Sequence, residues 1–169
     1  GSDTPVERIA SYADTVQFCL SKGLAAPVGS IVAGSAEFIE RARGARKILG
    51  GAMRQSGVIA AAGVVALESM IDRLSDDHAR ARRLAEALAT IDGINIDLDA
   101  VQTNIVIFKT EPAVNQLAFV DGMKANGVLV SNYGTRGVRM VTHYQIDDAA
   151  IDTAIAAATA VMSGQAVAA

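Results

Sequence analysis

Ten consecutive apolar residues, VIAAAGVVAL at 58–67, restrict how this chain can fold. They lie within an Ala-rich segment that predicts a helix over about 53–71. A helix that is apolar all round needs cover on every side. The apolar run is too short to cross a bilayer, so we expect the cover to be protein. The sequence therefore predicts that residues 1–70 are not ordered alone and that a partner chain or a symmetry mate fills this space.

The N-terminal part predicts two short strands joined by a loop of small residues. Thr4 and Glu7 form a capping box, with Pro5 as the first helical residue, and Ser35 is expected to cap a later helix. Strands are predicted at 15–21 and 28–35, and helices at about 5–13 and 36–47. One strand pair and two short helices leave apolar faces uncovered, so residues 1–55 do not predict a closed unit.

The C-terminal part predicts a different order of elements, in which two strands and a helix are followed by two more strands and a helix. Strands are predicted at 94–98, 103–109, 128–130 and 137–143, and helices at about 73–91, 113–126 and 148–162. Asp147 is expected to cap the last helix. This order suits an α+β unit in which helices cover one face of a small antiparallel sheet.

Composition excludes several classes of function. The formal charge is −3 and no Lys/Arg cluster could follow a phosphate backbone, so nucleic acid is not an expected partner. No segment predicts a membrane span, and no His, Cys, Asp and Glu cluster has metal-ligand spacing. The single cysteine, Cys19, lies in an apolar run and is interpreted as a small buried hydrophobic residue of a reducing, cytoplasmic compartment.

Lys22 stands out because the residues around it are too small to need it for packing. It lies in FCLSKGLAAPVGS, residues 18–30, between the two predicted strands. A partly desolvated lysine amine is a nucleophile that can form a Schiff base with a carbonyl. The alternative is a solvated lysine in a hairpin loop, which is the ordinary situation for this residue type.

Four motifs carry a resemblance to a known family. They are, in chain order, FCLSKGLAAPVGS at 18–30, KILGGAMRQSGVIAAAGVVALE at 47–68, QTNIVIF at 102–108 and VRMVTH at 138–143. From about residue 8 to 163, the chain resembles the C-terminal half of low-specificity L-threonine aldolases. The resemblance implies the α/β fold of fold type I pyridoxal-phosphate enzymes, with a small α+β domain. It also implies cleavage of β-hydroxy-α-amino acids, L-threonine or L-allo-threonine, to glycine and acetaldehyde.

The resemblance implies roles for three residues, Lys22, Arg54 and Arg139, and a fourth residue, His143, is a candidate from its place at the end of a predicted strand. Lys22 matches the lysine that binds pyridoxal 5'-phosphate as a Schiff base, and Arg54 matches an arginine that reaches the cofactor phosphate across a subunit boundary. Arg139 matches the arginine that binds the substrate α-carboxylate, a task suited to its planar, bidentate guanidinium. His143 could donate to substrate or cofactor, or could simply bond to backbone. Ala25 stands where the family commonly has glycine.

The family's ring-stacking histidine, its aspartate at the pyridine nitrogen and its phosphate-binding Gly and Thr all precede the matched region. The chain is therefore expected to be half of an active site, with Gly1 and Ser2 a scar of expression. Residues 3–72 are expected to end a large cofactor-binding domain, 73–163 to form the small domain and 164–169 a tail.

The expected partners are the N-terminal half of the same enzyme and further copies in a homo-oligomer, a dimer or a tetramer. Two alternatives remain open from the sequence. One is a folded fragment that associates without catalysis. The other is a different fold type I lyase that acts by β-elimination.

Overall fold

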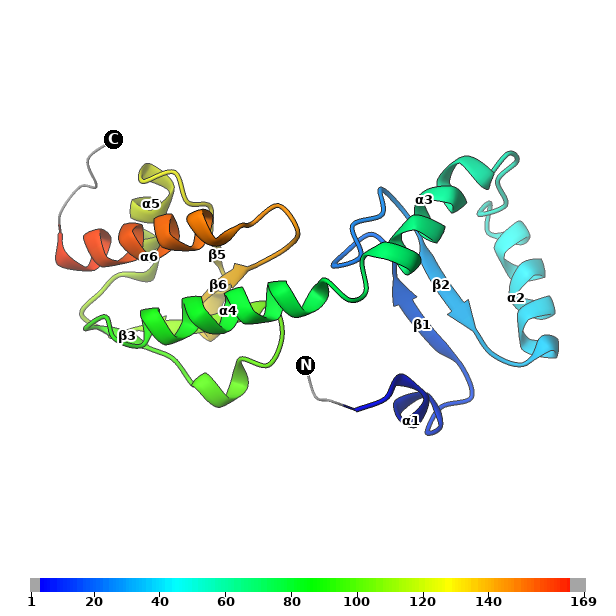
Figure 1. Cartoon of the computed structure of the whole chain (residues 1–169), viewed down its shortest axis with the longest axis horizontal. Helices are drawn as coiled ribbons and strands as arrows, with labels where there is room; N and C mark the ends of the chain where they lie inside the picture. The colour runs from blue at the N-terminus through cyan, green and yellow to red at the C-terminus, as the bar shows by residue number, and fades with distance from the viewer. Residues whose placement is uncertain (1–3, 165–169) are drawn as a thin grey trace. The chain divides into compact units, whose positions relative to one another are not determined.

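The computed structural model of the chain describes residues 4–164. The chain forms two compact units, an N-terminal unit that ends at Leu74 and a C-terminal unit that begins at Ser75 (Figure 1). Apart from Gly164, the expected tail lies outside the described residues. None of the helices within 4–164 has the length and apolar character needed to cross a membrane.

The N-terminal unit contains one strand pair and three helices. These elements are α1 (Val6–Ala10), β1 (Val16–Cys19), β2 (Ser30–Ala33), α2 (Ala36–Ile48) and α3 (Gly57–Ser69). β1 and β2 are antiparallel, as expected, and Cys19 lies opposite Ser30 in their register. Ser35 caps α2, its hydroxyl accepting a hydrogen bond from the Phe38 N–H at 3.2 Å. The N-cap position of α1 is occupied by Pro5 and not by Thr4 as the predicted capping box has it, and the Pro5 side chain has no atom that can accept a hydrogen bond.

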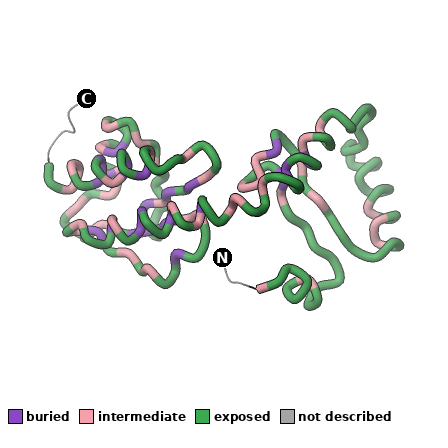
Figure 2. Tube along the Cα trace, viewed as in Figure 1, coloured by how far each residue is buried: buried purple, intermediate pink, exposed green. Residues whose placement is uncertain are grey.

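The apolar helix α3 begins at Gly57, four residues later than predicted. Gln55 has a φ of 51°, and this left-handed backbone cannot be part of an α-helix. Only Gly63 and Ala66 of α3 are buried, while Val58 is 79% exposed. The apolar surface that needs cover is thus open in this chain (Figure 2). The buried residues of the N-terminal unit are few: Leu20, Ala26, Gly63 and Ala66.

The C-terminal unit is a four-stranded sheet with helices. Its elements are α4 (Leu74–Leu88, whose first residue ends the N-terminal unit), β3 (Ile94–Asn95), the 3-10 turn η1 (Leu98–Ala100), β4 (Ile105–Thr110), α5 (Gln116–Ala125), β5 (Ser131–Asn132), the 3-10 turn η2 (Gly134–Arg136), β6 (Val138–Val141) and α6 (Asp148–Ser163). The strand order is β3-β4-β6-β5 and every pair is antiparallel, which confirms the predicted type of sheet. Asp147 caps α6 as predicted, accepting from the Ala150 N–H at 2.8 Å.

Two strand predictions in this unit are wrong in their bounds. Residues 128–130 form no strand, because the Val128 N–H bonds to the Met123 carbonyl at the end of α5 and pairing with β6 begins only at Ser131. The strand predicted at 94–98 ends at Asn95, because Asp97 starts the turn η1 by accepting from the Asp99 N–H at 3.0 Å.

The main core of the described residues lies in the C-terminal unit, where most of the buried segments in Figure 2 are found, and it combines side chains of α4, α5 and α6 with those of β4 and β6. Phe108 of β4 and Phe119 of α5 meet edge to face, with ring centroids 5.6 Å apart. Val138 and Met140 of β6 are buried, whereas Arg139 between them is half-buried. Because side chains alternate along a strand, Arg139 belongs to the sheet face turned away from this core.

Candidate functional site

Lys22 lies in the loop that joins β1 to β2, and the backbone of this loop is closely bonded. The Ala25 N–H donates to the Lys22 carbonyl at 2.8 Å, and the Ala26 N–H donates to the Leu20 carbonyl at 3.0 Å. The Leu20 N–H in turn bonds to the Gly29 carbonyl at 3.0 Å, and the Leu20 side chain is buried. The backbone beneath Lys22 is therefore fixed, while Lys22 itself is exposed.

The Lys22 amine forms no ion pair with a carboxylate of residues 4–164. Its neighbours Gly23, Ala25 and Ala26 are small, so they leave room beside the amine. A Cβ on Gly23 would meet the Leu74 side chain at 3.0 Å, which leaves little space for a larger residue there. The loop therefore leaves the Lys22 side chain accessible to a planar aldehyde cofactor.

Ala25 departs from the glycine expected of the family at a position where glycine has a physical advantage. Its φ is 59°, in the left-handed region that residues with a Cβ adopt only at a cost. That cost is about 1–2 kcal/mol for an L-residue. The loop therefore adopts the left-handed conformation at this position with alanine in place of glycine.

Cys19 and Ser30 form a second feature of this loop, which the sequence did not predict. They face each other at the ends of β1 and β2, and the Ser30 hydroxyl donates to the Cys19 sulfur at 3.5 Å. This hydrogen bond is the largest of the effects that lower the pKa of Cys19; desolvation opposes it, and the charge and a hydrogen bond of Lys22 lower the pKa further. Cys19 is only partly buried, so its interpretation as a buried hydrophobic residue is wrong.

Arg54 lies in the turn directly before α3 and is exposed. None of the carboxylates described forms an ion pair with it. The turn ends at Ser56, the N-cap of α3, so the positive end of the dipole of this helix adds to the guanidinium charge. Such an arrangement favours an anion, which is compatible with the phosphate role that the resemblance implies.

Arg139 lies on β6, one of the two inner strands of the sheet. It is flanked by Ile107 of β4 on one side and by Ser131 of β5 on the other. Within residues 4–164 no carboxylate pairs with its guanidinium. A half-buried arginine whose guanidinium pairs with no carboxylate of the described residues is suited to a carboxylate from outside the chain.

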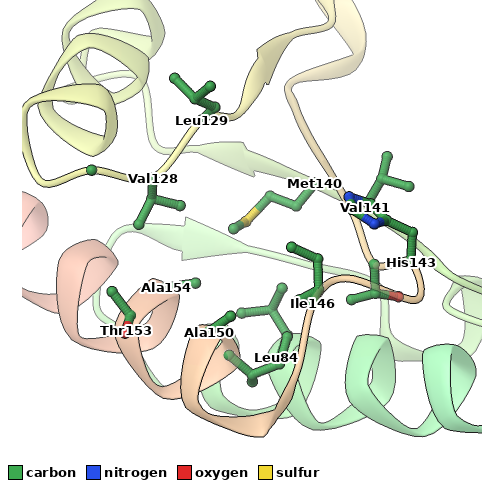
Figure 3. A pocket seen from close by; sticks show the side chains of 13 residues that line it. Leu84, Val128, Leu129, Met140, Val141, His143, Ile146, Ala150, Thr153 and Ala154 are labelled. Carbon is green, nitrogen blue, oxygen red and sulfur yellow. The ribbon is translucent and has the colours of Figure 1, made fainter.

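His143 follows β6 and lines an apolar groove of about 510 Å³ (Figure 3). Its Nδ1 accepts from the Gln145 N–H at 3.3 Å, so the neutral ring carries its proton on Nε2. The groove is lined by apolar side chains of α4, β6, α6, the segment after α5 and the loop before α6, among them Leu84, Met140 and Ile146. The backbone bond of His143 matches one of the two interpretations that the sequence left open.

The structure places Lys22 and Arg54 in the N-terminal unit, and Arg139 and His143 in the C-terminal unit. No group of three or more His, Cys, Asp and Glu side chains in the described part of the chain could hold a metal ion.

Comparison with known sequences decides the family. The model of the beta-eliminating lyase family matches residues 2–111, about two thirds of the chain. The chain belongs to the beta-eliminating lyase family. It is 43% identical over 144 residues to low-specificity L-threonine aldolase 1 of Arabidopsis thaliana, covering 84% of this chain and 40% of that protein. It is 39% identical over 141 residues to the low specificity L-threonine aldolase of Escherichia coli K12, covering 83% of this chain and 40% of that protein.

Solved structures place this beta-eliminating lyase chain in fold type I of the pyridoxal-phosphate enzymes, which confirms the predicted fold class. A protein assigned as an L-allo-threonine aldolase from Listeria monocytogenes matches with a TM-score of 0.72 at 17% identity, covering 94% of this chain and 47% of that one. The ureidoglycine-glyoxylate aminotransferase of Bacillus subtilis matches with a TM-score of 0.63 at 13% identity, covering 91% of this chain and 48% of that one. An aminotransferase of similar fold illustrates that fold alone does not fix the reaction.

The family depends on pyridoxal phosphate, as predicted. The chain spans about two fifths of the length of the curated relatives named above. The residues present fit this cofactor, because the Lys22 amine lies among small side chains and forms no ion pair within residues 4–164, and because Arg54 places a positive charge in the turn before α3.

Proposed function

We propose that this chain is the lysine-bearing part of a low-specificity L-threonine aldolase, which cleaves β-hydroxy-α-amino acids to glycine and an aldehyde. The observation that supports it most is the identity of about 40% to such aldolases, over more than four fifths of the chain. The proposal includes an N-terminal part of the same enzyme and assembly into a homo-oligomer. Without that N-terminal part the chain is expected to be inactive.

In this proposal the N-terminal unit supplies residues that bind the cofactor, and the C-terminal unit supplies residues that bind the substrate. Lys22 would hold the cofactor through its amine, and Arg54 would bind the phosphate near the N-terminus of α3. When bound, pyridoxal phosphate supplies a sink for the electron pair released as the Cα–Cβ bond breaks. Arg139 would bind the substrate carboxylate through two parallel N–H···O bonds and so fix the orientation of the Cα substituents. His143 is a candidate donor to the substrate through Nε2.

Borohydride reduction of the full-length enzyme loaded with pyridoxal phosphate tests the role of Lys22. We expect the pyridoxyl label on Lys22, and its loss in Lys22→Ala with unchanged circular dichroism, because an exposed loop lysine adds little packing. Lys47→Ala, which alters an exposed lysine of α2, is the matched control and should leave the label in place. A label on Lys47, Lys109 or Lys124 would overturn the proposal.

The family match supports β-elimination as a second candidate reaction. Product analysis with the full-length enzyme separates the two reactions. An aldolase forms glycine and acetaldehyde from threonine, whereas an eliminating enzyme forms ammonia and a 2-oxo acid. The detection of glycine in a one-to-one ratio with acetaldehyde would support the aldolase, and release of ammonia without glycine would contradict it.

A further inference from the structure

The apolar groove beside His143 opens where the pairing of two strands ends (Figure 3). On one side of β6, β4 pairs with all four of its residues. On the other side, β5 pairs with β6 over only two residues of each strand. Residues 127–129 and 140–143, which would continue this second pairing, line the groove instead. One edge of β6 is therefore open at the groove.

The backbone of Val141 faces this open edge. In an antiparallel sheet, successive residues of a strand direct their N–H and C=O groups alternately to the two neighbouring strands. The Thr142 N–H donates to the Asn104 carbonyl on the β4 side at 3.0 Å. The Gly137 carbonyl accepts from the Tyr133 N–H on the β5 side at 2.7 Å. By this alternation the N–H and C=O of Val141 point to the groove, where β5 no longer pairs with β6, and so offer a donor and an acceptor to an extended segment.

The side chains around this backbone suit an apolar occupant. Within residues 4–164, none of the side chains that line the groove belongs to an acid, a lysine or an arginine. Met140, Ile151 and Ala154 line it and are themselves buried, whereas Leu129 is 82% exposed. An extended segment laid along β6 would direct every second side chain towards the buried residues. We therefore expect the occupant to carry apolar residues at alternate positions.

We propose that this groove binds an extended segment from the N-terminal part of the same enzyme, which adds to β6 as a strand. This inference rests on the proposed function, which includes that N-terminal part. The chain spans about two fifths of the length of the curated relatives, so a large part of such a protein could supply the segment. A segment of the same polypeptide also has a higher effective concentration at the groove than a second copy has.

The chain's own residues 128–130 leave the groove open, although their sequence predicted a strand. The chain leaves α5 through Gly127, which has a φ of 77° and whose N–H donates to the Lys124 carbonyl at 3.0 Å. The Val128 N–H donates to the Met123 carbonyl at 2.9 Å. These two bonds tie the start of the segment to the end of α5, so they oppose its movement onto β6. They favour a separate strand as the occupant.

A photo-crosslinker in place of Leu129 identifies the segment that occupies the groove. In the full-length enzyme, Leu129→benzoylphenylalanine should crosslink within one molecule to a peptide of the N-terminal part, which mass spectrometry identifies. The matched control is the same substitution at Leu117, which is 57% exposed on α5 and does not line the groove. A crosslink to a second copy, or only to residues of the 169-residue chain, would overturn the proposal.

Hydrogen exchange of the Val141 amide, measured residue by residue, tests the proposed backbone pairing. In the 169-residue chain it should exchange at least about tenfold faster than the Met140 amide, which faces β4. In the full-length enzyme it should slow by at least about tenfold. Leu129→Asp should reverse part of this slowing, because it places a charge beside the apolar groove, and Leu117→Asp is the matched control. Equal exchange of Val141 in both proteins would overturn the proposal.

The outcomes separate this inference from the proposed function. An enzyme that is labelled on Lys22 and forms glycine, but whose crosslinker at Leu129 does not reach the N-terminal part, would overturn the groove assignment alone. A pyridoxyl label on another lysine, together with a crosslink from Leu129 to the N-terminal part, would overturn the proposed role of Lys22 and support the groove assignment.

Discussion

The arginines of this chain differ in whether the fold supplies their partners. Arg80 bonds to Asp148 at 3.1 Å, Arg82 bonds to Glu86 at 2.6 Å, and Arg83 pairs with Asp152. These pairs link α4 to α6 or lie within α4, and at the surface each contributes at most about 1 kcal/mol to stability. Arg139 has no such carboxylate among the described residues, and this contrast supports a ligand rather than a structural contact for its guanidinium.

Removal of the Arg139 guanidinium should weaken substrate binding and spare the cofactor. In the full-length enzyme Arg139→Ala should raise the Kd for the amino acid about 30- to 150-fold, since charged hydrogen bonds worth about 2–3 kcal/mol are lost. Arg139→Lys should recover only part, because an ammonium cannot form the bidentate pair. Spectral titration with glycine measures the Kd, and Arg82→Ala is the control. Loss of bound cofactor in Arg139→Ala, or an unchanged Kd, would contradict the assignment.

At the scale of helices and strands, short sequence motifs correctly predicted the features that depend only on contacts between residues close in the chain. Ser35 and Asp147 cap the helices that their positions indicated, because an N-cap needs only a side-chain oxygen near the next few N–H groups. The β-forming residues at 128–130 predicted a strand that does not form, because the Val128 N–H donates to a carbonyl at the end of α5. The left-handed Gln55 has no signal in a single sequence.

The candidate site, like the fold, could be predicted only in part from the sequence. Lys22, Arg54 and Arg139 are predictions from motifs, because the chemistry proposed for them depends on residue type at a fixed place in the chain. The contact between Cys19 and Ser30 depends on the register of two strands joined by a loop, so it emerged only with the structure. The one sequence signal for this contact is that Cys19 and Ser30 lie equally far along the chain from the centre of the loop.

The turn between β5 and β6 requires glycine at one position, Gly137. Its φ is 110°, and a Cβ there would collide with the backbone carbonyl of Phe108. Gly127 also has a positive φ, 77°, but a Cβ there would enter open space. Gly127→Ala should therefore cost about 1 kcal/mol of unfolding free energy, and Gly137→Ala at least about 3 kcal/mol. Urea unfolding of the two variants measures this, and equal losses would show that the collision is relieved by movement of the strand.

The whole molecule combines two units with unequal cores. The C-terminal unit buries large side chains from α4, β4, α5, β6 and α6 in one cluster, among them Phe108, Phe119 and Ile151. The N-terminal unit buries one large side chain, Leu20, with Ala26 and Ala66. Its helix α3 exposes Val58, Val64 and Val65, which is the apolar surface that the sequence predicted to need cover.

Amide hydrogen exchange should reveal this inequality along the 169-residue chain. Peptides from β4, β6 and α6 should be strongly protected, because a large core must open before their amides exchange. Peptides from α2 and α3 should exchange much faster, since no residue of α2 is buried and α3 buries only Gly63 and Ala66. In the proposed full-length enzyme the exchange of α3 should slow by at least about tenfold, because the proposed N-terminal part would cover its apolar surface. Equal protection of both units in the 169-residue chain, or unchanged exchange of α3 in the full-length enzyme, would mean that the apolar helix is stable without the partner that its composition demands.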